Sequence, residues 1–185
     1  MNNRLVAEPL PPLGELLGAA HPADEALCRG YTEHRRREFL AWRAIVRREL
    51  GRDAILKYAP NGRPQVEGGP YISVAHSREM VVVRFSDAPC AVDTEPLDRN
   101  FDRAKSRYMT SEEEHLSDDR RLPAAVWCAK ETLYKLSDGS GADLLRDFTV
   151  SEVDFAEGRI VGSIRGGAPV TLGIEFLDGN IIVFA

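Results

Sequence analysis

The stretch Trp127-Cys128-Ala129-Lys130-Glu131-Thr132-Leu133-Tyr134-Lys135 has the pattern of an amphipathic helix. Trp127, Glu131 and Lys135 follow one another at four-residue steps, so a helix places them on one face. Lys130 points about 100° away from Glu131 around the same helix. Because a carboxylate and an ammonium group at this spacing also form ordinary surface ion pairs, the stretch predicts a helix but not, by itself, a site.

Upstream of this helix the sequence indicates two helix starts. Pro123 suits the first turn of the helix just described. Thr110 with Glu113, or Ser111 with Glu114, has the spacing of a capping box, in which a hydroxyl and a carboxyl group cap a first turn reciprocally. The sequence therefore predicts that another helix begins there.

Downstream of the helix the pattern changes from helical to β. The run Asp138-Gly139-Ser140-Gly141 is predicted to end the helix. Four short runs of strand-like composition follow, separated by glycine-containing turns typical of antiparallel hairpins. These runs are Thr149 to Phe155, Arg159 to Ile164, Val170 to Phe176 and Ile181 to Phe184. Helices combined with hairpin-connected strands predict an α+β fold.

A second long helix is predicted from Thr32 to Leu50, with Gly51 placed to end it. Its apolar residues recur at three- and four-residue steps: Phe39, Trp42, Val46 and Leu50. Arg36, Arg43 and Arg47 form a separate basic stripe on the same helix. The helix therefore presents one face to a core and another to solvent or to an anion.

The net charge of −5 conceals a basic segment. From Arg29 to Arg63 the chain has ten Lys or Arg and four Asp or Glu, so the remainder carries a charge of −11. A basic segment in an acidic protein indicates a local anion site rather than general affinity for nucleic acid. A solvated helix face would have the same composition.

The composition indicates a cytoplasmic protein with reduced thiols. A chain of 185 residues that is 43% hydrophobic can bury a core as one domain or as two small packed halves. No segment approaches the roughly 18 apolar residues of a membrane span, and the first residues lack the apolar stretch of a secretory signal. Cys28, Cys90 and Cys128 have neither a disulfide-framework nor a zinc spacing, so we expect buried or half-buried thiols.

Two carboxylates lie at the end of an apolar run, Met80 to Val92, that is broken only by Arg84 and the turn Ser86-Asp87-Ala88-Pro89. In a strand, alternate residues point to one face, so Asp93 and Glu95 project together. Like charges this close are tolerated where water screens them or where a cation lies between them. Together with Glu131 they would offer three hard oxygen ligands, which suit Mg²⁺ shared with a substrate phosphate better than zinc.

A short predicted strand, Tyr71 to Ser77, ends in a histidine and a serine. A histidine at a strand end is commonly a satisfied structural residue. His76 is preceded in the chain by Asn61-Gly62-Arg63-Pro64, a turn that presents a basic side chain. The pair could therefore bind an anionic group instead.

Taken in order, these motifs resemble the signature of the 4'-phosphopantetheinyl transferases, most closely the surfactin-synthetase-activating type. The matching elements are Gly62-Arg63-Pro64, His76-Ser77, Val92-Asp93-Thr94-Glu95 and Trp127 with Lys130-Glu131 and Lys135. The resemblance extends from about Arg35 to Lys135. It implies a pseudo-twofold pair of similar α+β halves with antiparallel sheets and an active site in the cleft between the halves. We expect an N-terminal half, 1–87, that binds the adenine and 3'-phosphate side of coenzyme A, and a C-terminal half, 88–185, with Mg²⁺ and the catalytic helix.

The reaction implied by the resemblance is that of a holo-acyl-carrier-protein synthase. A serine of an apo carrier protein attacks coenzyme A, takes its 4'-phosphopantetheine arm and releases adenosine 3',5'-bisphosphate. By resemblance, Asp93, Glu95 and Glu131 would hold Mg²⁺, and Glu131 would act as general base directly or through a water. Lys135 would lie against the α-phosphate and steady the leaving group, so the predicted catalytic residues are Glu131, Lys135 and Asp93.

The resemblance also assigns coenzyme A contacts to a set of basic residues: Arg36, Arg43, Arg63, His76, Lys130 and Lys135. Arg63 and His76 would bind the 3'-phosphate and adenine end, because a planar guanidinium suits phosphate. For Lys130, a substrate phosphate contact and a structural ion pair are both open. Trp127 is interpreted as packing that fixes the helix.

Two other classes of function fit parts of the pattern: a Mg²⁺-dependent transferase or hydrolase on another nucleotide diphosphate, and a non-catalytic module that binds an anion or acidic protein. As partners we expect an apo acyl or peptidyl carrier protein of fatty-acid, polyketide or nonribosomal-peptide biosynthesis, with no nucleic acid and no membrane. We also expect a monomer. The carrier is predicted to dock on a basic segment that contains Arg99, Arg103, Lys105 and Arg107.

Overall fold

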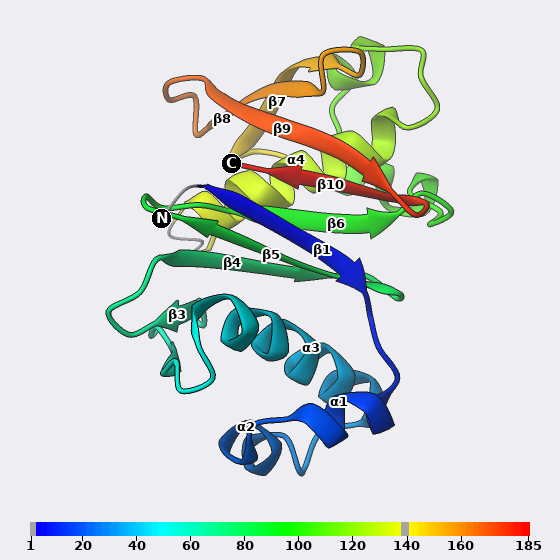
Figure 1. Ribbon diagram of the computed structural model, residues 1–185. Coiled ribbons are helices and arrows are strands. Elements are labelled where there is room, and N and C mark those ends of the chain that lie inside the picture. Colours follow the sequence, from blue (N-terminus) through cyan, green and yellow to red (C-terminus); the bar gives the residue numbers. More distant parts are fainter. Residues whose placement is uncertain (1–2, 138–140) are drawn as a thin grey trace. The chain divides into compact units, whose positions relative to one another are not determined.

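The computed structural model describes residues 3–137 and 141–185 (Figure 1). The chain divides into two compact units, Met1–Pro89 and Cys90–Ala185. Each combines helices with an antiparallel sheet, so the predicted α+β class is confirmed. Within the described part of the chain, no helix has the length and apolar character needed to cross a membrane.

The first unit is a three-stranded sheet covered by helices. Its elements are β1 (Arg4–Pro9), α1 (Leu13–Ala19), α2 (Pro22–Leu27), α3 (Glu33–Leu50), β2 (Leu56–Tyr58), β3 (Pro64–Val66), β4 (Tyr71–His76) and β5 (Met80–Ser86). The sheet has the order β1-β5-β4, and β2 and β3 form a separate hairpin. Figure 1 shows α3, in cyan, lying along one face of the sheet.

Helix α3 has the ends and the buried face that its sequence predicts. The Thr32 side chain accepts a hydrogen bond from the backbone N–H of Arg35, and Gly51 follows the last residue at φ 108°. A positive φ of this kind favours glycine. The apolar side chains of α3 pack into a core with β1, β4 and β5: Phe39, Leu40, Trp42, Ile45 and Val46.

The second unit is a five-stranded antiparallel sheet with one long helix packed on it. Its elements are β6 (Val92–Pro96), the 3-10 turns η1 (Asp102–Arg107) and η2 (Glu113–His115), α4 (Leu122–Leu136), β7 (Phe148–Asp154), β8 (Arg159–Ile164), β9 (Val170–Leu177) and β10 (Asn180–Phe184). The strand order is β6-β10-β9-β8-β7, which confirms the four predicted C-terminal strands. The run Asp138–Ser140, predicted to end the helix, lies outside the described residues, and α4 itself ends at Leu136.

The predicted capping box forms, but the predicted helix after it does not. The Thr110 N–H donates to Glu113 Oε2 at 2.9 Å, and the Glu113 N–H donates to Thr110 Oγ1 at 3.3 Å. Only the short turn η2 follows. Because the Glu113 carboxylate is buried and also binds α4 and β7, the chain turns into the core at this point instead of continuing as an α-helix.

All three cysteines are thiols, as expected from their spacing. Cys28 and Cys128 are buried, and Cys90 is half-buried.

Candidate active site

Strand β6 and helix α4 place the predicted catalytic residues of the second unit close together. Asp93 and Glu95 alternate along the edge strand β6, which pairs with β10. Helix α4 packs against both strands and carries Glu131 and Lys135. Burial, followed by the neighbouring charge of Asp93, raises the pKa of the Glu131 carboxyl. Burial also raises the pKa of the Glu95 carboxyl, and the charges of Asp93 and Glu131 add to that shift, so the three carboxylates are near enough to repel one another.

Lys135 is the cation that balances Asp93. Its Nζ donates to Asp93 Oδ1 at 2.8 Å and to the backbone carbonyl of Val92 at 2.8 Å. Side-chain exposure is 29% for Lys135 and 12% for Asp93, so this pair is shielded from water more than a surface ion pair. Lys135 on α4 thus contacts β6, the strand that carries Asp93 and Glu95.

Glu95 is held by two residues that the sequence analysis assigned to other roles. The Trp127 indole N–H donates to Glu95 Oε1 at 3.1 Å. Arg99 pairs with the same oxygen, and its guanidinium stacks 4.6 Å from the Trp127 ring centroid. Tyr108 meets the same ring edge-on at 5.0 Å, which agrees with the predicted packing role of Trp127. Trp127 therefore also orients the Glu95 carboxylate. Helical spacing alone cannot reveal this contact, because the two residues belong to different elements.

Lys130 points into the core of the unit. It is 0% exposed, and its Nζ lies 2.8 Å from Glu113 Oε2. The contact has the distance of an ion pair but not the directed geometry of a hydrogen bond. Burial lowers the pKa of the Lys130 ammonium. Of the two roles left open by the sequence, the observed contact is that of a structural pair, and a phosphate contact would require this pair to open.

Asp93 and Glu131 retain oxygen atoms that could accept a further ligand. Asp93 Oδ2 is buried and has no hydrogen-bond partner. Glu131 accepts no hydrogen bond from any described residue. Beneath them Cys128 is fully buried, and burial, followed by the charge of Asp93, raises the pKa of its thiol, so it stays neutral. The cluster therefore has uncompensated negative charge.

The carboxylate cluster fits a metal ion that takes only some of its ligands from the protein and the others from water and substrate. Within residues 3–137 and 141–185, no group of three or more His, Cys, Asp or Glu side chains is arranged to hold a metal by itself. Mg²⁺ usually keeps several waters and takes one or two carboxylates together with substrate phosphates. The buried, unpartnered Asp93 Oδ2 and the free coordination capacity of Glu131 meet that requirement.

Trp127→Phe is expected to lower the carrier modification that the resemblance implies about tenfold while retaining the fold. The substitution keeps an aromatic ring against Tyr108 but removes the only donor from Trp127 to Glu95. Steady-state kinetics on a carrier protein would measure the change. Trp42→Phe in the first unit is the matched control, since it changes the same side chain outside this cluster. Equal activity losses in both variants would contradict a specific role for the indole N–H.

In the first unit, His76 belongs to a cluster centred on a buried glutamate. Glu38 Oε1 lies 2.9 Å from His76 Nδ1 and 2.9 Å from His34 Nε2. Arg35 Nη1 donates to Glu38 Oε2 at 3.1 Å and lies 3.5 Å from His76 Nε2. Glu38 side-chain exposure is only 8%. Sequence reasoning missed Glu38, although its position three residues after Arg35 and four after His34 on a helix is a usable signal.

The other predicted coenzyme A contacts also lie in the first unit. Arg43 is buried, pairs with Asp24 Oδ1 at 2.9 Å and stacks over the Phe39 and Trp42 rings. Arg36 is half-buried, and its Nε has no hydrogen-bond partner. Arg63 lies in the turn between β2 and β3, beside Gly62 at φ 83°. A phosphate contact by each of the three stays a prediction.

Residues 89–170 match the family model of the 4'-phosphopantetheinyl transferase superfamily. The match covers β6, α4 and the segment between them, and so includes all three carboxylates and Lys135. No curated protein matches the chain. The match supports the superfamily, whose general reaction is the transfer of phosphopantetheine from coenzyme A to carrier proteins.

Proposed function

We propose that this protein transfers the 4'-phosphopantetheine arm of coenzyme A to a serine of an apo carrier protein in a Mg²⁺-dependent reaction. The observation that carries the proposal is the cluster of Asp93, Glu131 and Lys135, in which two carboxylates keep unpartnered oxygen atoms beside an ammonium group. The two α+β units in one chain support the surfactin-synthetase-activating type.

Asp93, Glu95 and Glu131 would hold the metal ion. When bound, Mg²⁺ supplies charge compensation for the pyrophosphate of coenzyme A. In the structure, Asp93 contributes its free Oδ2 and Glu131 its carboxylate, whereas Glu95 already shares one oxygen with Trp127 and Arg99. Asp93 and Glu131 are therefore proposed as the main protein ligands, with Glu95 in support.

Glu131 and Lys135 would carry the proton and charge movements of the transfer. A carboxylate with a raised pKa is a better base than an ordinary glutamate, so Glu131 suits removal of the proton from the carrier serine. The carrier oxygen then attacks the β-phosphorus as the bond to the α-phosphate oxygen breaks. Lys135, whose ammonium group already lies at the carboxylates, would stabilise the charge that develops on the leaving phosphate.

The Glu38 cluster of the first unit supports a role for His76 in binding the 3'-phosphate of coenzyme A. Three basic side chains, His34, Arg35 and His76, surround one carboxylate. Glu38 fixes the rings of both histidines beside the Arg35 guanidinium, a grouping of nitrogen donors that suits contact with a dianionic phosphate. Arg36, Arg43 and Arg63 are proposed as further phosphate contacts.

The basic segment around η1 is the proposed docking surface for the carrier. A cavity of about 540 Å³ lies beside this segment and is lined in part by Arg99, Arg120 and Arg121. Arg99 also contacts Glu95, so it links this cavity to the carboxylate cluster. An acidic carrier helix that docks here would bring its serine towards Glu131.

Intact-mass spectrometry tests the proposed function. Purified apo carrier protein, coenzyme A and Mg²⁺ are incubated with the protein, with an EDTA control. We expect the carrier to gain the mass of one phosphopantetheine arm, and the gain to disappear with EDTA. No gain on acyl and peptidyl carriers would refute the proposal, and a gain that survives EDTA would refute the metal dependence.

A further inference from the structure

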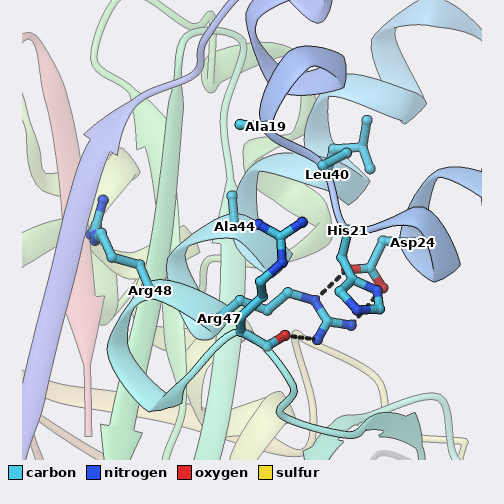
Figure 2. A pocket seen from close by; sticks show the side chains of 9 residues that line it. Ala19, His21, Asp24, Leu40, Ala44, Arg47 and Arg48 are labelled. Atoms are coloured by element: carbon cyan, nitrogen blue, oxygen red, sulfur yellow. Dashed lines mark hydrogen bonds and ion pairs between the residues drawn. The ribbon is translucent and has the colours of Figure 1, made fainter.

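A cavity of about 260 Å³ in the first unit lies between the ends of α1 and α2 and one face of α3 (Figure 2). The candidate catalytic and coenzyme A residues do not line it. The residues that do are Ala19, Ala20, His21, Asp24, Leu40, Ala44, Arg47, Arg48 and Arg52. No step of the proposed transfer reaction uses this cavity.

The base of the cavity carries more positive than negative charge. Asp24 is 2% exposed and is shared by two guanidinium groups. Arg43 Nη1 lies 2.9 Å from Asp24 Oδ1, and Arg47 Nε lies 2.6 Å from Asp24 Oδ2. One carboxylate therefore faces two cations in a site that is largely shielded from water. Electrostatic attraction between these cations and a further anion is stronger there than in bulk water.

Arg47 supplies charge to this cavity but already uses four of its five N–H donors within the protein. Its Nε and Nη2 donate to Asp24, and its Nη1 donates to the carbonyls of Arg52 and Ala54. Figure 2 shows Arg47 reaching towards Asp24, whereas Arg48 points away to the other side. There Arg48 pairs with Glu8 on β1, so it too is committed.

Two lining residues have uncommitted donors. The Arg52 guanidinium has no hydrogen-bond or ion-pair partner in the described part of the chain. His21 Nδ1 accepts a hydrogen bond from the Ala23 N–H at 3.3 Å, so the proton of the neutral ring resides on Nε2. That N–H likewise has no partner among the described residues. Arg52 and His21 therefore each line the cavity with a donor that is available to a ligand.

The rest of the lining is apolar and small. Ala19, Ala20, Leu40 and Ala44 supply methyl and methylene surface beside the cations. The cavity has the volume of about nine liquid water molecules at roughly 30 Å³ each. A compact apolar group attached to an acid would fill it, whereas a bare inorganic ion would leave the apolar wall in contact with water.

We propose that this cavity binds a small organic anion, with a carboxylate or phosphate-monoester head at Arg52 and His21 and a short apolar body against Leu40 and Ala44. A planar guanidinium pairs with either head by two parallel hydrogen bonds. The cavity lining includes none of the proposed transfer residues, although Arg43, a proposed coenzyme A contact, pairs with the lining residue Asp24. Occupancy of the cavity is measured without carrier or coenzyme A.

Binding to the 185-residue chain is measured by calorimetry and by amide chemical shifts. Hexanoate and phenyl phosphate are the two probes, which distinguish the two head groups. Hexanamide and inorganic phosphate are the matched controls that lack the charge or the apolar body. We expect at least one probe to bind with a Kd of about 1 mM or tighter, and to shift amides of residues 19–52.

Three variants locate the binding. Arg52→Gln should weaken it about tenfold, and Ala44→Phe, at an exposed position on α3, should abolish it by filling the cavity. Arg146→Gln, an exposed arginine of the second unit, should change nothing. The proposal is overturned if neither probe binds, if a control ligand binds as tightly as its probe, or if both cavity variants bind as the unmodified protein does. Ala44→Phe keeps the test decisive if Arg52→Gln fails to fold.

Discussion

Asp93→Ala and Glu131→Gln should each lower carrier modification by about 10³-fold or more at any practical Mg²⁺ concentration. Asp93 carries the buried oxygen without a partner and also accepts from Lys135, so its loss removes both the proposed metal contact and the anchor of the ammonium group. Glu131→Gln keeps the shape of the side chain but removes the charge and the base. Intact-mass spectrometry of the carrier measures the loss.

The folded state should survive both substitutions. Burial and the charge of Asp93 raise the pKa of Glu131, so at neutral pH its ionised form disfavours folding. Neutralising it should therefore raise the Tm of the metal-free protein by a few degrees. Glu152→Ala, which removes an exposed carboxylate paired with Arg159, is the control and should leave activity unchanged. Full transfer by either active-site variant would refute the assignment.

Lys130→Ala should destabilise the protein by about 3 kcal/mol, because it leaves the buried Glu113 carboxylate without its cation. The carboxylate keeps the backbone N–H groups of Thr110 and Val150, at 2.9 and 2.8 Å, and these limit the loss. For a chain of this size the Tm should fall by about 6 °C or more. Thermal or urea unfolding measures both quantities.

A matched lysine separates this structural role from a substrate contact. Lys105 pairs with Glu114 at 2.7 Å, but both side chains are partly exposed, so Lys105→Ala should cost less than about 1 kcal/mol. Lys130→Met combined with Glu113→Gln should recover much of the lost stability, since no buried charge remains. If Lys130→Ala were as stable as Lys105→Ala yet raised the KM for coenzyme A, the phosphate contact predicted from the sequence would replace the structural interpretation.

The elements of this fold that local pattern determines were predictable from the sequence. Helix α3 begins after the Thr32 cap and ends at Gly51, where the periodicity of its apolar residues also ends. The strands β7 to β10 follow the alternation between their glycine turns. In contrast, β1 pairs with β5 across most of the first unit, so only the tertiary fold reveals it as a strand.

The sequence predicted which residues form the candidate site, but it did not predict all of the contacts that these residues make. Helical periodicity places Glu131 and Lys135 on one face, and the family resemblance brings that face to Asp93; in the structure Lys135 contacts Asp93 and the charge of Asp93 acts on Glu131. The burial of Glu113 was not predictable, because its partners on α4 and β7 are distant in the sequence and a capping glutamate is ordinarily exposed. The same holds for Asp24, which the sequence offers only as an acidic residue in a short helix.

The adjacent residues Lys130 and Glu131 occupy two different environments within one sequence motif. The Lys130 ammonium group is enclosed with Glu113 and serves the architecture of the second unit, whereas the Glu131 carboxylate lies unpartnered beside Asp93. A chain with this lysine but with glutamine in place of the glutamate would keep the shape and give up the proposed chemistry. Under the proposed function, the glutamate is thus the position of the motif on which transfer depends, and the lysine is the position on which the scaffold depends.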